Sequence, residues 1–160
     1  MRRVIGIVLL AVALVVGNFA LTSANASDNG DNDDVIRLVG RIVVDEYVDL
    51  APKGEPNAGD HLVFSDDVYW NGNKVGFLDG TCTFTRVKAT AGRFHCTATL
   101  TLPKGQITIQ GAIRIPFGEN FLGPFYLAIT GGTGAYDEAR GQVRVRTVSD
   151  TVERITVMLD

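Results

Sequence analysis

The chain has few of the side chains that usually bind metals or act as nucleophiles. Of its 160 residues, two are histidine and two are cysteine, and no Cys, His or Asp cluster has the spacing of a metal site. Ser65 and Ser149 both lack the Gly-x-Ser-x-Gly context of a hydrolase nucleophile. The sequence therefore predicts no metal site, no cofactor and no serine hydrolase.

Long helices and phosphate-binding loops are also missing. No stretch of the chain after residue 26 keeps a 3.6-residue apolar period long enough for a substantial helix. The glycines of Gly131-Gly132-Thr133-Gly134 resemble a phosphate loop, but no lysine follows them and residues 142–146 alternate instead of forming a helix. We interpret these glycines as a turn between strands, where positive φ is needed.

The N-terminus has the pattern of a secretory signal peptide. Arg2 and Arg3 precede an apolar run, and the small residues of Ala24-Asn25-Ala26 predict cleavage after Ala26. A transmembrane anchor is the alternative, although the run is shorter than the ~20 residues that a spanning helix needs. We assign residues 1–26 to the signal, 27–34 to a disordered acidic tail and 35–160 to one domain of a secreted protein.

Excess positive charge is absent from the exported chain. Removal of Arg2 and Arg3 leaves 13 basic and 18 acidic side chains, a formal net charge of −5. This balance disfavours nucleic acid as a partner, and we expect no membrane association after cleavage. A hydrophobic small molecule is the expected partner.

The two cysteines predict a disulfide, because exported proteins meet an oxidising environment. If residues 81–87 and 93–102 form a hairpin centred on Ala89, Cys82 and Cys96 are equidistant from its centre and face one another. Two buried free thiols are the alternative.

Strict alternation of apolar and polar residues recurs along the chain. It predicts eight strands, within residues 35–48, 61–70, 81–87, 93–102, 107–115, 125–130, 142–148 and 152–159. Eight antiparallel strands with one apolar face can close on themselves and leave no exposed edge. We predict an all-β, eight-stranded antiparallel β-barrel with a small internal cavity; a two-sheet sandwich is the alternative.

Three segments resemble a known family. They are Gly59-Asp60-His61-Leu62-Val63-Phe64-Ser65-Asp66-Asp67-Val68-Tyr69, Gly105-Gln106-Ile107-Thr108-Ile109-Gln110-Gly111 and Ile129-Thr130-Gly131-Gly132-Thr133-Gly134. In this order they resemble the allene oxide cyclase barrel family, which is related to dirigent proteins and has bacterial members that act as spirotetronate-type cyclases. The resemblance covers residues 35–159 and implies a barrel with an apolar cavity that steers ring closure without a cofactor.

The resemblance also implies residues of the cavity. The acidic residue on the first strand of the plant cyclases matches Glu46, and their asparagine after Phe-Ser corresponds to Asp66. Their cavity cysteine matches Cys82, and their two cavity phenylalanines match Phe64 and Phe94. The tyrosine that follows their Gln-Gly is Ile113 here, so the allene oxide reaction itself is not expected.

The alternation gives independent candidates for chemistry. Glu46 and Asp66 are in phase with apolar residues, where desolvation raises the pKa of a carboxyl group toward neutrality and suits it to acid–base catalysis. Arg86 shares the inward phase and could hold an oxygen of the substrate. The alternative places each of these charges at a barrel rim. Asp45, Asp49 and Asp67 are interpreted as surface charges.

Five aromatic side chains would shape a bound molecule or simply fill the core. They are Phe64, Phe84, Phe94, Tyr69 and Phe125, and Ile113 joins them as a candidate substrate contact. The favoured function is a cofactor-free cyclase or dirigent-like protein that steers isomerisation or a Diels–Alder type cycloaddition of a hydrophobic natural product. A secreted barrel that binds such a molecule without chemistry is the alternative. Because relatives form dimers or trimers, the sequence leaves open whether this protein forms a homodimer or a homotrimer.

Overall fold

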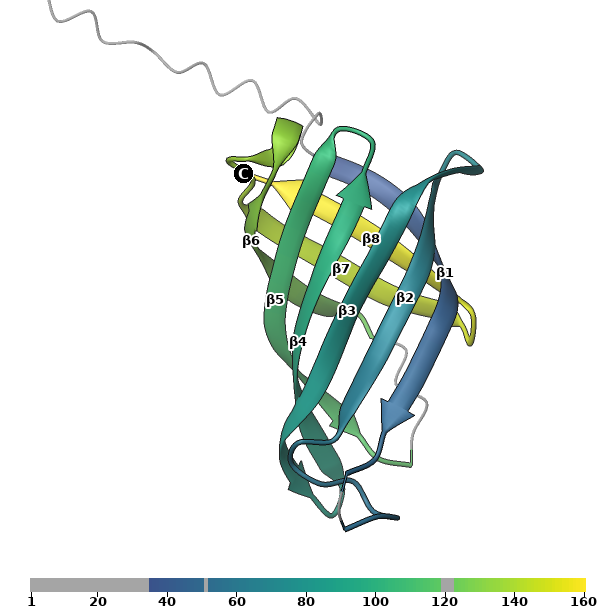
Figure 1. The fold of residues 1–160 in the computed structure, drawn as a ribbon, viewed down its shortest axis with the longest axis vertical. Coiled ribbons are helices and arrows are strands. Elements are labelled where there is room, and N and C mark those ends of the chain that lie inside the picture. The colour runs from purple at the N-terminus through teal and green to yellow at the C-terminus, as the bar shows by residue number, and fades with distance from the viewer. Residues whose placement is uncertain (1–34, 51, 119–122) are drawn as a thin grey trace, which may run out of the picture. The chain divides into compact units, whose positions relative to one another are not determined.

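The fold is given by a computed structural model that describes residues 35–50, 52–118 and 123–160. The predicted signal peptide and acidic tail lie outside these residues. The described chain forms a closed antiparallel barrel in which each strand pairs with the next and the last pairs with the first (Figure 1). The predicted barrel is confirmed, and the two-sheet sandwich is excluded.

The strands follow one another around the barrel in chain order. They are β1 (Val35–Val48), β2 (His61–Trp70), β3 (Asn73–Lys88), β4 (Ala91–Leu102), β5 (Gly105–Pro116), β6 (Phe125–Gly132), β7 (Gly141–Ser149) and β8 (Val152–Leu159). A short 3-10 helix, η2 (Gly134–Tyr136), follows the glycine-rich turn after β6. Within the described ranges, no helix has the length and apolar character needed to cross a bilayer.

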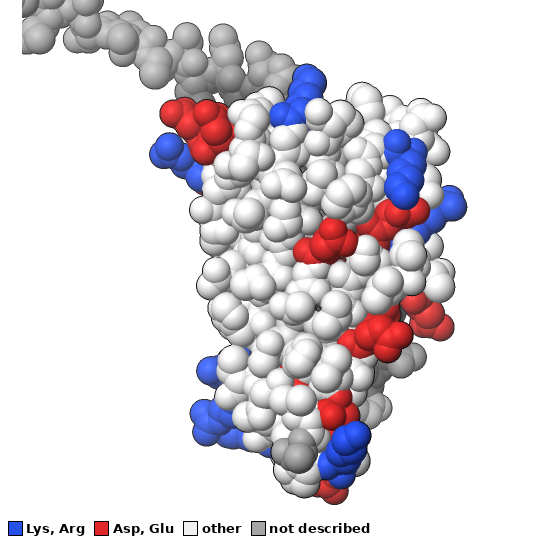
Figure 2. Space-filling model, viewed as in Figure 1, with Lys and Arg blue, Asp and Glu red and all other residues white. Residues whose placement is uncertain are grey.

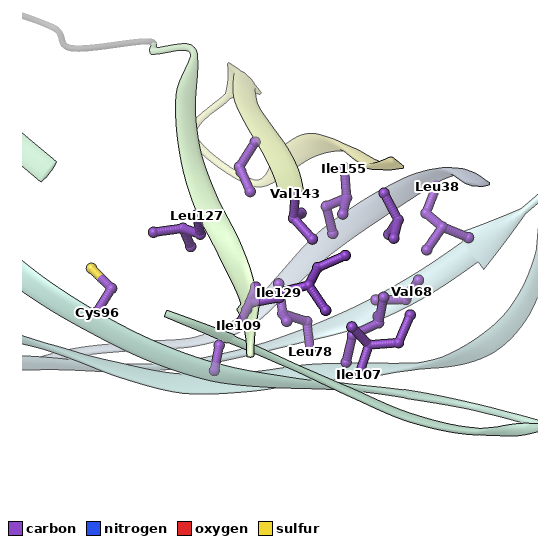
Figure 3. Packing of buried hydrophobic residues seen from close by; sticks show 14 of the residues in the cluster. Leu38, Val68, Leu78, Cys96, Ile107, Ile109, Leu127, Ile129, Val143 and Ile155 are labelled. Carbon is purple, nitrogen blue, oxygen red and sulfur yellow. The ribbon is translucent and has the colours of Figure 1, made fainter. Parts of the chain in front are cut away.

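Aliphatic side chains fill much of the barrel interior. Val68, Ile107, Val143 and Val157 are completely buried, and the side chains drawn in Figure 3 converge from strands all around the barrel. Burial of each such side chain stabilises the fold by roughly 1.5–3 kcal/mol relative to exposure. An eight-stranded barrel is just wide enough for side chains to fill, so a ligand can enter only where this packing stops.

The predicted disulfide is confirmed. Cys82 of β3 and Cys96 of β4 are directly paired in the register, and their sulfur atoms are 2.06 Å apart. From the cysteines to the pair Phe84–Phe94 the hairpin has the predicted register, and nearer its turn a bulge shifts the pairing by one residue. The bridge closes a 14-residue separation and ties two neighbouring strands of the barrel wall.

Two β-bulges change which residues face the interior. The pairing of β1 with β2 shifts between Ile42 and Val44, and the pairing of β3 with β4 shifts between Phe84 and Arg86. An extra residue in one strand reverses the inward and outward phase of every residue after it. Alternation read through these two points therefore assigns the wrong face to the end of β1 and to the end of β3.

Candidate active site

A cavity of about 200 Å³ lies inside the barrel. Its wall is mostly apolar and includes the disulfide, and the lining side chains are those of Ile42, Asp45, Leu62, Phe64, Asp66, Cys82, Phe94, Cys96, Ile113, Ile115, Phe125, Leu127 and Glu153. Three carboxylates belong to this lining, whereas none of its described residues is Lys, Arg or His. The cavity is thus an apolar space with one strongly acidic component.

The strand register explains why these side chains meet. Opposed residues of antiparallel strands project to the same face of the sheet. Ile42 pairs with Asp66, and Asp45 pairs with Phe64. Phe94 of β4 pairs with Ile113 of β5. Of the ligand contacts expected from the sequence, Phe64, Phe94 and Ile113 therefore line the cavity, and so does the aromatic candidate Phe125.

Asp66 is the most deeply buried of the three carboxylates. Its side chain is 2% exposed, and no described group forms a hydrogen bond with its buried Oδ2 atom. Burial raises the pKa of Asp66 to about 6, with further contributions from the negative charges of Asp45 and Asp79. Gly40 makes room for this carboxylate, because a Cβ atom there would lie 2.8 Å from Oδ2. Asp66 therefore lies on the inward face, as expected from the sequence.

Glu153 of β8 is the second titratable group in the cavity. Its register partner on β1 is Gly40, the residue beside Asp66, and its carboxylate accepts a 3.4 Å hydrogen bond from the Thr147 hydroxyl. Burial raises the pKa of Glu153 to about 7, followed in importance by the negative charge of Asp66. Glu153 was not among the residues selected from the sequence, although it alternates with the buried Ile155 and Val157.

Asp45, and not Glu46, is the carboxylate that β1 contributes to the cavity lining. After the bulge, Glu46 pairs with Val63, which faces the outer surface beside Thr81. The expected inward orientation of Glu46 is therefore wrong. Asp45 is exposed, as expected for a surface charge, but its side chain also lines the cavity. No pattern in the sequence predicts that Asp45 and not Glu46 lines the cavity, because the alternation of apolar residues ends where the bulge begins.

Arg86 and Tyr69 also lie outside the cavity. The bulge in β3 places Arg86 opposite Arg93 on the outer face, so its expected inward orientation is wrong. Tyr69 directly follows Val68, which is completely buried, so it points to the other face of β2. The Arg41 guanidinium lies 4.7 Å from the centre of its ring. Neither residue lines the cavity, so neither is retained as a contact of a bound molecule.

Phe84 is buried next to the cavity but does not line it. Its ring stacks on that of Phe94, with 3.9 Å between the ring centroids, and meets the edge of Phe117 at 6.0 Å. Stacked aromatic rings hold one another in place. Phe84 therefore supports the orientation of Phe94, which does line the cavity.

The segment between β1 and β2 is held by a buried carboxylate that the sequence did not suggest for this role. Asp60 is fully buried and accepts hydrogen bonds from the Tyr47 hydroxyl at 2.8 Å, the Leu50 N–H at 2.9 Å and the Asn57 N–H at 2.8 Å. The backbone bond from Leu50 is the main cause that lowers the pKa of Asp60. Burial and the bond to Asp60 raise the pKa of Tyr47 to about 12.

Two of the cavity carboxylates, Asp66 and Glu153, have pKa values that suit proton transfer. In the described part of the chain, no group of three or more His, Cys, Asp or Glu side chains is placed to hold a metal ion. Carboxyl groups with pKa values of about 6 and about 7 can both donate and accept protons at neutral pH. Perturbed pKa values inside a cavity are typical of catalytic sites.

Comparison with known proteins identifies the family. A family model described as "Allene oxide cyclase barrel like domain" matches residues 41–159. The chain belongs to the allene oxide cyclase barrel-like family. The resemblance drawn from the sequence is thus confirmed. No curated protein shows significant similarity to the sequence.

Several solved structures share the fold of this allene oxide cyclase-like barrel. A structure titled "Pyocyanin demethylase" is 30% identical with a TM-score of 0.69, and the match covers 79% of this chain and 99% of that one. The exo-specific intermolecular Diels–Alderase AbnU is 16% identical with a TM-score of 0.60, and the match covers 78% and 96% of the two chains. The pterocarpan synthase dirigent protein GePTS1 is 17% identical with a TM-score of 0.54, covering 78% and 82%. At these lower identities, the last two show the fold alone.

Proposed function

We propose that this barrel is a cofactor-independent enzyme that isomerises a hydrophobic small molecule, ring closure included, by proton transfer in its cavity. The observation that carries the proposal is the pair Asp66 and Glu153, whose pKa values are raised to about 6 and about 7 beside an apolar wall. An isomerisation by proton transfer can use one group to remove a proton and another to return one. It needs no oxidant or reductant.

The two pKa values suggest a division of roles. At pH 7, a carboxyl group with a pKa near 6 is mostly ionised and can act as a base, whereas one with a pKa near 7 is about half protonated and can act as an acid. Asp66 would therefore remove the proton, and Glu153 would deliver one elsewhere on the same molecule. Asp45 raises both pKa values through its negative charge.

The lining of the cavity also suggests the kind of substrate. At about 200 Å³, the cavity is smaller than the roughly 300–1,000 Å³ of pockets for drug-sized ligands. It would hold a compact ring system, or only the reacting part of a longer chain, between Phe64 and Phe94. Because the described lining has three carboxylates and no basic side chain, a substrate with a cationic or proton-donating edge would fit best.

A second candidate function is hydrolytic removal of an N-methyl group from a pyocyanin-like aromatic molecule. Water would release the methyl carbon as formaldehyde, the conjugated ring of the substrate would take up the two electrons, and air would then reoxidise the reduced ring. This function is favoured by the 30% identity to the structure titled "Pyocyanin demethylase", which extends over 99% of that chain. A positively charged aromatic ring would complement the acidic cavity. This candidate and the isomerase make different products, so product masses distinguish them.

The decisive experiment uses extracts of the source strain from which the gene has been deleted. The purified protein is incubated with the extract, and metabolites are compared by mass and retention time. An isobaric product supports isomerisation, and a product lighter by one CH₂ supports demethylation. A compound that stays bound unchanged would identify a carrier without chemistry and would refute both proposals.

Variants then test the assigned residues. Asp66→Asn and Glu153→Gln should each lower turnover by at least about 100-fold, as expected for a lost acid or base. Glu46→Gln is the matched control, because Glu46 lies on the outer face of the same strand that carries Asp45. Activity that is lost in the Glu46 variant but kept in the other two would overturn the assignment.

A further inference from the structure

A second site candidate lies on the outer surface of the barrel wall. A hollow of about 300 Å³ is lined by seven residues, four of which are basic: Arg86, Lys88, Arg93 and Arg114. The remaining lining residues are Thr90, Ala91 and Gly92, so no described acidic side chain lines the hollow. In Figure 2, basic residues gather at the lower left of the visible face, whereas acidic residues lie mainly to the right.

The three arginines are neighbours in the strand register. Arg93 of β4 pairs with Arg86 of β3 on one side and with Arg114 of β5 on the other. Since the next residue, Phe94, lines the central cavity, the side chain of Arg93 projects away from it. All three arginines therefore share the outer face, with Phe94 and Ile115 on the opposite side of the same wall.

This arrangement is unfavourable without a partner of opposite charge. Like charges directly opposite one another on a sheet are destabilising, and here three stand in one row. The only salt bridge among the described residues joins Lys74 to Asp67, so it does not neutralise any member of the row. Four basic side chains around one hollow, in a chain with a formal net charge of −3, would be stabilised by a bound anion.

We propose that the hollow is a binding site for a diphosphate-type group, that is, two linked tetrahedral oxyanions. The planar fork of arginine binds phosphate oxygens in pairs. Because neighbouring strands are about 4.8 Å apart, the backbones of Arg86 and Arg114 are separated by about 10 Å. A linked pair of oxyanions can engage all three guanidinium groups, whereas a single one would leave at least one of them without full contact.

The test is calorimetric titration of the purified protein with sodium pyrophosphate, orthophosphate and sulfate. Pyrophosphate should bind more tightly than the other two, and added sodium chloride should weaken its binding. Arg93→Gln and Arg114→Gln should each lower pyrophosphate affinity by about tenfold or more, as expected for loss of a charge-assisted hydrogen-bonding group. Equal affinity for orthophosphate and pyrophosphate would overturn the assignment to a linked pair.

The control removes the same charge from another part of the outer face. Arg154 pairs with Arg146 and is exposed, but it does not line this hollow. Arg154→Gln should change pyrophosphate affinity by less than about twofold, and an equal loss in this control would show a general charge effect and refute the site. In ligand-free protein at low salt, Arg93→Gln should raise Tm, because it relieves the repulsion between neighbouring arginines. A fall in Tm would contradict the inference that the three opposed arginines destabilise the ligand-free protein.

Discussion

Replacement of Asp66 by asparagine should change how the stability of the barrel depends on pH. Asp66 is 2% exposed, and burial raises its pKa from 3.8 to about 6 in the folded protein. The folded state therefore binds its proton more tightly than the unfolded state. The resulting stabilisation is complete below about pH 4 and is lost as pH rises through about 6. Asparagine carries no titratable proton, so the variant should lack this loss.

The magnitude follows from the size of the shift. A rise of about two pKa units corresponds to roughly 3 kcal/mol between the two protonation states. Between pH 4 and pH 8, the wild type should lose about 2–3 kcal/mol more free energy of unfolding than Asp66→Asn. The asparagine amide has its own burial cost, but that cost is the same at every pH, so the difference between the two pH values is the informative quantity.

Urea unfolding at a series of pH values measures this difference. The matched control is Asp67→Asn, which changes the next residue of β2 but affects only the surface pair with Lys74, an interaction of the kind that contributes about 0–1 kcal/mol. Glu153, whose pKa is raised mainly by burial, should leave a residual slope in the Asp66 variant, smaller than in the wild type because the negative charge of Asp66 also raises that pKa. Parallel stability curves for wild type and Asp66→Asn would refute the claim that Asp66 is buried and proton-binding.

Three further perturbations have definite expected outcomes. Replacing Cys82 and Cys96 by serine should lower the free energy of unfolding by about 3 kcal/mol, as expected for a closed loop of about 15 residues; urea titration measures it. Gly40→Ala places a Cβ 2.8 Å from Asp66 Oδ2 and 3.1 Å from the Ile155 side chain, so it should displace the carboxylate and lower turnover while the protein stays folded by circular dichroism. Asp60→Asn should loosen the segment between β1 and β2, seen as faster cleavage there in limited proteolysis; unchanged cleavage would contradict its bonding role.

The sequence predicts the barrel well because its signals are local and repeated. Alternation marks each strand, and the positions of Cys82 and Cys96 predict the register of one hairpin, which the structure confirms. Asp66 and Phe64 also lie on the predicted face, because the pairing of β2 with β3 is unbroken around them. Where the ladder is regular, a period of two is sufficient to assign faces.

The errors in the candidate site arise where the ladder is irregular. Glu46 and Arg86 each follow a bulge, and one additional residue moved them to the outer face. A bulge has no reliable signature in a single sequence, because it depends on how two strands pair and not on either strand alone. Glu153 is different, because its alternation with Ile155 and Val157 is visible in the sequence. That alternation is sufficient to assign Glu153 to the inward face of its strand.

The position of the carboxylates argues that they are present for function. Asp66 and Glu153 each have raised pKa values, which means that each lowers the stability of the folded state at neutral pH. The interior around them is otherwise filled by aliphatic and aromatic side chains, and apolar residues of similar volume at these positions would remove that cost. The bulge in β1 adds Asp45 to the same cavity and raises both pKa values further. A fold selected for stability alone would have no need of this cluster, whereas the acid–base chemistry that we propose for the cavity would depend on it.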